Sequence, residues 1–240
     1  MREELAGSAE RVVALRLIRL NLVAAVAFVL GGGLFALGAV FAQLGVVSLV
    51  TVNTTYLVGG VFFSTGGYVS VLLVINAGAA RGRGEADPMR WWAFLPQRRD
   101  WLSAFVLLVG TLLFAVSLVA AFAAGLTPRQ SNGWIWLPDI LGCTCFLVSG
   151  HLGLLAVCGG RVGVRVHDLG WWVVAVNQFG SIVFFLAGIA AFTRPTTSQA
   201  VDVGLVNWGT FAGAICFAVG GVMQACDKPT PTRTVVHDLS

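Results

Sequence analysis

Charged residues are scarce in this chain: they make up 11% of its 240 residues, whereas apolar residues make up 57%. A soluble domain usually carries about 25% charged residues, which cover the surface that faces water. Lysine is nearly absent, since Lys228 is the single lysine and arginine supplies the other cations. This bias, together with the richness in Ala, Gly and Val, indicates a GC-rich bacterial genome. The shortage of charge and the mean hydropathy of +0.85 exclude a soluble domain and predict a membrane protein.

The sequence also lacks the common signatures of catalysis. It has no CxxC pair, no His/Glu spacing typical of a metal site, no Gly-rich phosphate loop and no nucleophile elbow. The five cysteines lie in or beside apolar segments, where packing explains them better than a metal or redox role. The arginines are scattered along the chain instead of forming one stripe, which argues against nucleic acid as a partner. We therefore expect a non-enzymatic protein without metal or cofactor.

Six apolar runs are long enough to cross a bilayer as helices, which takes about 20 residues each. No run shows the alternation of polar and apolar residues that a membrane β-barrel needs. The sequence therefore predicts an all-α integral membrane protein with six transmembrane helices. The predicted spans are 17–42, 53–76, 101–124, 136–159, 171–193 and 203–225.

The cations predict the orientation of these spans. Of the 15 Lys and Arg residues, 13 fall before the first span, after the last, or between spans two and three or four and five. Only Arg129 and Arg194 lie in the other loops. Because cationic loops stay in the cytoplasm, both termini are expected there, in the inner membrane of a bacterium. The chain then divides into a cytoplasmic segment 1–16, hairpins 17–76, 101–159 and 171–225, cytoplasmic loops 77–100 and 160–170, and a tail 226–240.

The hairpins resemble one another in sequence. The odd spans share a Gly-xxx-Phe pair, seen at Gly31/Phe35, Gly110/Phe114 and Gly180/Phe184. The even spans share Gly-xxx-Phe-xxx-Gly, in which a spacing of four places all three residues on one helix face. This pattern comprises Gly59, Phe63, Gly67, Gly142, Phe146, Gly150, Gly213, Phe217 and Gly221. It predicts three parallel two-helix repeats whose small residues pack helices closely; a role of the glycines as a pathway or hinge stays open.

Polar residues inside spans are candidates for function. His151 lies near the middle of the fourth span, with Thr144 seven residues away on roughly the same face. Tyr68 occupies the position in the second span that matches His151. These three residues form the candidate mid-membrane site, in which His151 either responds to protons or contacts a solute. Alternatively, it is neutral and hydrogen-bonded between helices, with Tyr68 as the expected partner.

Three aspartates lie at or near predicted helix starts. Asp100 and Asp168 each precede the aromatic residues that open an odd span, which predicts two helix N-caps. Asp139 stands at the outer start of the fourth span and is either a cap or a vestibule charge. The loop 77–100 combines arginines with Trp91-Trp92-Ala93-Phe94-Leu95, as is typical of a stretch that lies against anionic lipid headgroups.

The Gly-xxx-Phe hairpins that end in Cys226-Asp227-Lys228-Pro229 resemble bacterial YrhK-like membrane hairpins, and Arg99-Asp100-Trp101 is similar to the entry of actinobacterial multi-span relatives. The resemblance implies hairpin architecture and no catalytic residue. Two functions stay open. One is a structural or interaction role, with lipid and a second copy or another membrane protein as partners. The other is transport of a small solute or ion near His151 and Tyr68.

Overall fold

The computed structural model describes residues 2–77, 88–161 and 163–227 of the chain. Four of the cations that predict the orientation, Arg81, Arg83, Lys228 and Arg233, lie outside these residues, as does most of the predicted tail. Within the described part the protein is all-helical, and no strand forms there beyond one isolated bridge between Thr193 and Ala200.

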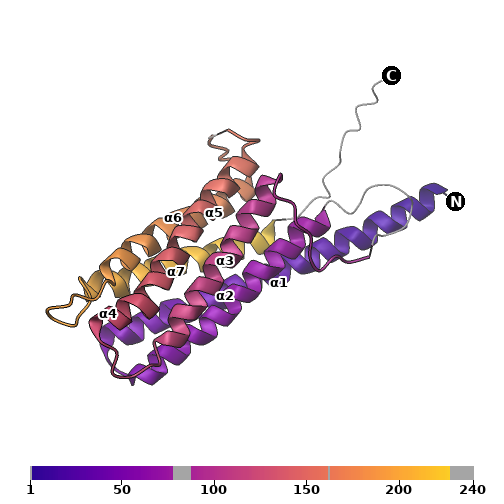
Figure 1. Ribbon diagram of the computed structural model, residues 1–240. Helices are drawn as coiled ribbons and strands as arrows, with labels where there is room; N and C mark the ends of the chain where they lie inside the picture. Colours follow the sequence, from indigo (N-terminus) through magenta and orange to yellow (C-terminus); the bar gives the residue numbers. More distant parts are fainter. Residues whose placement is uncertain (1, 78–87, 162, 228–240) are drawn as a thin grey trace.

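Six helices are long and apolar enough to cross a membrane, which confirms the predicted number of spans. One of them is composite, because α4, the π-helical turn η1 and α5 follow each other without a break from Pro128 to Val157. Figure 1 shows the six lying lengthwise in one bundle. The elements are α1 (Arg2–Leu44), α2 (Leu49–Ala77), α3 (Arg99–Ala120), α4 (Pro128–Ser131), η1 (Asn132–Trp136), α5 (Leu137–Val157), α6 (Leu169–Ala190) and α7 (Val203–Cys226).

The first helix begins well before its predicted start at residue 17. Its 43 residues extend over about 65 Å at 1.5 Å per residue, roughly twice the hydrocarbon core of a bilayer. Its N-terminal part projects past the rest of the bundle (Figure 1). The segment 2–16 contains no proline and is rich in Ala, Leu, Glu and Arg, which are good helix formers. The apolar run marks where the helix can enter lipid, whereas the helix itself begins earlier, in a segment that contains charged residues.

The fourth span also begins earlier than predicted, at Pro128 instead of 136. Thr127 is its N-cap: the Thr127 hydroxyl accepts a hydrogen bond from the backbone N–H of Gln130, and the Gln130 side chain accepts one from the backbone N–H of Thr127. This capping box, with proline in the first turn, starts a helix before the apolar run does.

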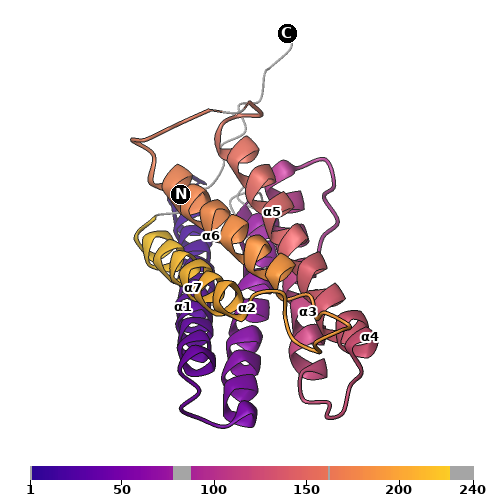
Figure 2. The same ribbon diagram turned by 90° about the vertical axis from the view of Figure 1, so that its left-hand side faces the viewer.

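The six long helices form a closed ring. Each one packs against the next along the chain, and α7 packs against α1. Figures 1 and 2 show the connections at the two ends of this ring. We call the end with loops 45–48, 121–127 and 191–202 the hairpin end. The opposite end, where α1 projects and α7 finishes, is the terminus end.

Hydrogen bonds from each even-numbered span to the next hairpin tie the ring together at the hairpin end. Asn53 on α2 donates to the carbonyl of Ala121 just after α3, at 2.8 Å. The indole N–H of Trp136 donates to the carbonyl of Gly188 on α6, also at 2.8 Å. The Asn207 amide on α7 donates to the Gln43 side chain on α1 at 3.0 Å. Each donor lies six residues before the first glycine of its Gly-xxx-Phe-xxx-Gly motif.

Candidate functional site

Paired glycines and phenylalanines hold each hairpin together. In the first hairpin, a methyl group added to Gly31 would lie 2.7 Å from a ring carbon of Phe63, and one added to Gly59 would lie 2.9 Å from a ring carbon of Phe35. Each ring thus rests on the glycine of the facing helix, where a larger residue would not fit. In the same way, Gly110 pairs with Phe146, Gly142 with Phe114 and Gly213 with Phe184. Gly180 faces Phe217 at an ordinary contact distance of 3.5 Å, and its close contact is Cβ of Cys216 at 2.8 Å.

The second glycine of each motif in the even spans faces the neighbouring hairpin. A methyl group on Gly67 would lie 3.3 Å from Leu108 Cα on α3, and one on Gly221 would lie 2.9 Å from the carbonyl oxygen of Ala25 on α1. Gly150 lies directly against the side chain of Gln178 on α6. The nine predicted packing residues therefore lie at helix contacts, with the first glycine inside a hairpin and the second between hairpins.

The six phenylalanines of these motifs meet at the centre of the ring. The phenyl groups of Phe35, Phe114 and Phe184 contact one another. Their centroid distances are 5.5 Å for Phe35–Phe114, 6.2 Å for Phe114–Phe184 and 6.4 Å for Phe35–Phe184. Phe217 contacts Phe63 at 5.4 Å and Phe146 at 5.9 Å. The space left among these rings is about 10 Å³, no more than one water molecule needs. We call this layer the phenylalanine septum: Phe35, Phe63, Phe114, Phe146, Phe184 and Phe217.

A cavity of about 320 Å³ lies on the hairpin side of the septum. All six membrane-length helices contribute to its wall, and Phe35, Phe114 and Phe184 form its floor. We call it the hairpin-side cavity. Its polar wall residues from the helices include Asn53, Tyr56, Ser117, Asp139, Asn207 and Thr210.

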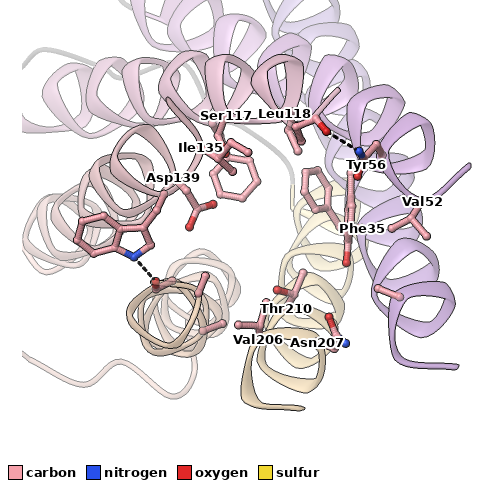
Figure 3. Close-up of a pocket in the computed structure, with 18 of the residues that line it drawn as sticks. Phe35, Val52, Tyr56, Ser117, Leu118, Ile135, Asp139, Val206, Asn207 and Thr210 are labelled. Carbon is pink, nitrogen blue, oxygen red and sulfur yellow. Dashed lines mark hydrogen bonds between the residues drawn. The ribbon is translucent and has the colours of Figure 1, made fainter. Parts of the chain in front are cut away.

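Asp139 is the single charged residue in the wall of the hairpin-side cavity. It lies three residues, about 4.5 Å along the helix, before Gly142, the glycine that faces Phe114 of the septum. Figure 3 shows its carboxylate directed into the cavity, with Tyr56 and Thr210 across from it. The carboxylate makes no hydrogen bond or ion pair with the residues that the structure describes. Of the two roles open for Asp139, the vestibule charge fits this geometry, since the helix begins eleven residues earlier at Pro128.

Gly188 leaves room for this carboxylate. A methyl group at Gly188 would lie 3.2 Å from Oδ2 of Asp139, tighter than ordinary contact. The carbonyl of Gly188 accepts the indole N–H of Trp136, so the α5–α6 contact is fixed one turn above Asp139. The sequence holds no spacing motif for this arrangement; the available signal was an acidic residue within an apolar run.

A second cavity, of about 260 Å³, lies on the terminus side of the septum and is again lined by all six membrane-length helices. Its polar wall includes Ser103 and Ser149, whose hydroxyls donate to each other's backbone carbonyls at 2.9 and 2.8 Å. Asn177 also lines it, and the Asn177 Oδ1 atom is buried without a hydrogen-bond partner. We call this the terminus-side cavity. The two cavities and the septum between them form an hourglass.

The predicted mid-membrane site is not formed. His151 and Thr144 are exposed on the outer face of α5, and the Thr144 hydroxyl donates to the carbonyl of Ile140 in its own helix. Tyr68 is also on the outer surface, and its hydroxyl donates to the carbonyl of Trp91 at 3.1 Å instead of to His151. A matching repeat position does not determine which way a side chain faces.

The two predicted caps differ. Asp168 is the N-cap of α6, and its Oδ1 accepts the backbone N–H of Gly170 at 2.9 Å. Asp100 lies inside the first turn of α3, whose N-cap position is occupied by Arg98. Its carboxylate pairs with the Arg98 guanidinium and accepts the backbone N–H of Trp101. The prediction was therefore wrong for Asp100, because α3 begins at Arg99, two residues before the predicted start at 101.

The described part of the predicted interfacial loop folds against the terminus end. Asn76 holds it, since its amide donates to the carbonyl of Arg90 and its Oδ1 accepts the Arg90 N–H. Trp91, Trp92 and Phe94 remain largely exposed, whereas Trp101 is buried and stacks on Phe105 at 4.8 Å. Exposed aromatic rings at a helix end suit the headgroup region of a bilayer.

No group of three or more His, Cys, Asp or Glu side chains comes together among the described residues. All five cysteines are free thiols, and Cys143 is the one that lines a cavity wall. A comparison of the chain with models of protein families, with curated proteins and with solved structures finds no match. The resemblance to YrhK-like hairpins therefore stays a prediction.

Proposed function

We propose that this protein moves a small solute across the membrane along the axis of the helix ring. The observation that carries the proposal is the hourglass. Two cavities, each bounded by all six membrane-length helices, lie on opposite sides of one apolar septum. A helix bundle that serves only for packing does not need polar cavities along its axis, whereas a pathway for a solute does. In this proposal the solute site lies in the two central cavities, and not at His151 and Tyr68 on the outer surface.

The proposal includes a transmembrane orientation and a repeat symmetry. The three hairpins are taken as repeats around an axis along the membrane normal, supported by the same glycine–phenylalanine exchange in each hairpin. Both termini are placed in the bacterial cytoplasm. Nine arginines among the described residues at or beyond the terminus end support this placement (Arg2, Arg11, Arg16, Arg19, Arg90, Arg98, Arg99, Arg161 and Arg165). A YrhK-like family membership would agree with this architecture.

In this proposal the septum is the closed constriction of the pathway. An apolar constriction excludes water and hydrated solutes, and it needs no charged residue to do so. Opening requires the rings of neighbouring hairpins to separate, which small residues at the contacts permit by sliding of the packed helices. Gly67, Gly150 and Gly221 lie at those contacts between hairpins. The activity is non-enzymatic, and the cavities supply binding and exclusion of water.

Flux across proteoliposomes tests this function. Vesicles that contain the wild-type protein are exposed to a panel of small polar solutes, and swelling is followed by light scattering. We expect faster entry of at least one solute than into protein-free vesicles, and a further increase for Phe63→Ala, which thins the septum. Phe179→Ala is the matched control, because Phe179 is 60% exposed on the outside of α6. Vesicles with either the wild type or Phe63→Ala that stay as tight as protein-free ones would overturn transport.

A structural or interaction role is the second candidate, and the dry centre favours it. The six phenylalanine side chains fill the centre of the helix bundle, as dense packing alone would require. In that role the partners are lipid, anionic headgroups at the arginines of the terminus end, and a second copy or another membrane protein. The flux experiment separates the two candidates, because a scaffold leaves vesicles tight even when the septum is thinned.

A further inference from the structure

We propose that the hairpin-side cavity binds a small organic cation, such as a primary or quaternary ammonium compound, with Asp139 as its counter-ion. This inference rests on the proposed function in one respect: it names the class of solute that the pathway takes. Binding itself does not require transport, so the two can be tested separately.

The charge of the cavity wall is the first argument. Asp139 is its single carboxylic acid, and the wall contains no Arg, Lys or His. No described residue neutralises the carboxylate, although an ionised carboxylate within a membrane protein normally has a partner. A buried carboxyl group without a partner favours its neutral form. A monovalent cation in the cavity would supply the missing partner and stabilise the ionised carboxylate of Asp139.

The aromatic wall is the second argument. Phe35, Phe114 and Phe184 form the floor, while Tyr56 and Trp136 stand in the side walls. The face of an aromatic ring attracts a cation and also accommodates an apolar body, so such walls favour organic cations over strongly hydrated metal ions. Ca²⁺ would need six to eight oxygen ligands, and the wall supplies a single carboxylate.

Size and hydrogen bonding are the third argument. The volume of about 320 Å³ has room for roughly ten water-sized groups, which corresponds to a small amine and not to a peptide or a lipid. The hydroxyls of Tyr56, Ser117 and Thr210 line the same cavity and make no hydrogen bond to described residues. An ammonium group has up to three N–H donors, so it can pair with Asp139 and donate to two of these oxygens.

Equilibrium dialysis of the purified full-length protein in lipid nanodiscs tests the site, with radiolabelled benzylamine as the probe. Benzyl alcohol, which has a similar shape and no charge, controls for partition into lipid. We expect saturable binding of about one benzylamine per chain and no saturable binding of the alcohol. Asp139→Asn should raise the dissociation constant at least tenfold. Asp202→Asn should not change it, because Asp202 caps α7 outside the cavity and Asn also caps well.

Two outcomes would overturn the site: no saturable binding of benzylamine to the wild type, or equal affinity in the wild type and Asp139→Asn. Gel filtration of each variant confirms that a loss of binding is not a loss of fold. Failure here is distinguishable from failure of transport. Solute flux that is the same in the wild type and Asp139→Asn would keep the pathway and reject the cation, whereas binding without flux would keep the site and reject the pathway.

Discussion

Gly32 and Gly33 are neighbours on α1 with opposite surroundings, and the same substitution at each should have opposite effects. A methyl group at Gly32 would lie 2.7 Å from the carbonyl oxygen of Ala214 and 2.9 Å from the backbone nitrogen of Ala218, both on α7. A methyl group at Gly33 would meet nothing within 4 Å. Gly32→Ala therefore tests the contact that closes the ring, and Gly33→Ala is its control on the next residue.

The expected magnitude follows from these distances. Ordinary contact begins near 3.4 Å, so α1 and α7 must separate by up to about 0.7 Å, and backbone atoms cannot rotate away as a flexible side chain can. Overpacking of this kind costs about 1–3 kcal/mol, and part of the dispersion energy along the helix contact is lost as well. Gly33→Ala should change stability by roughly 0 to +1 kcal/mol, in the stabilising direction, because alanine favours helix.

Unfolding by SDS titration from mild detergent, followed by circular dichroism, measures both variants on one scale. We expect Gly32→Ala to unfold at a clearly lower SDS fraction than the wild type, and Gly33→Ala at an equal or higher one. If the two variants are equally stable, the close approach of α1 and α7 is not present and the ring is not closed as described.

Three further predictions use the same titration. Phe184→Ala should cost about 3–5 kcal/mol, because it empties a place in the septum, while Phe179→Ala on the lipid-facing side should cost less than half as much; equal costs would contradict the septum. Asp168→Ala should cost about 1 kcal/mol, and Asp168→Asn should restore most of it, so a failure of Asn to restore stability would count against capping. His151→Ala should leave stability and solute flux unchanged, since His151 is exposed on α5; a loss of flux would return this residue to the pathway.

Much of the architecture could be predicted from the sequence. The number of spans follows from apolar runs, and the helix contacts follow from the repeated glycines and phenylalanines, because only small residues allow close approach in lipid. Helix boundaries were less accurate. The start at Arg2 depends on helix propensity outside the apolar run, and the start at Pro128 depends on the capping box of Thr127 and Gln130.

The candidate site was much harder to predict. Tyr68 and His151 match in repeat position, yet both face outward, because a matching position in the sequence does not determine which way a side chain faces. The phenylalanines were expected at helix contacts, but that six of them would meet as one layer depends on ring closure between α1 and α7. The sequence leaves Asp139 as either a cap or a vestibule charge, and the choice depends on the helix start at Pro128 and on the cavity that Asp139 lines.

Sidedness of cysteine labelling tests the hourglass most directly. In a version of the protein without its five native cysteines, Thr210→Cys, Ser149→Cys and Phe63→Cys place one thiol in each cavity and one in the septum. The variants are treated in sealed vesicles with a charged, membrane-impermeant thiol reagent from one side or the other. We expect Thr210→Cys to react only from the hairpin side, Ser149→Cys only from the terminus side, and Phe63→Cys from neither. Reaction of Phe63→Cys from both sides, or of neither cavity position from any side, would contradict two aqueous cavities separated by the phenylalanine septum.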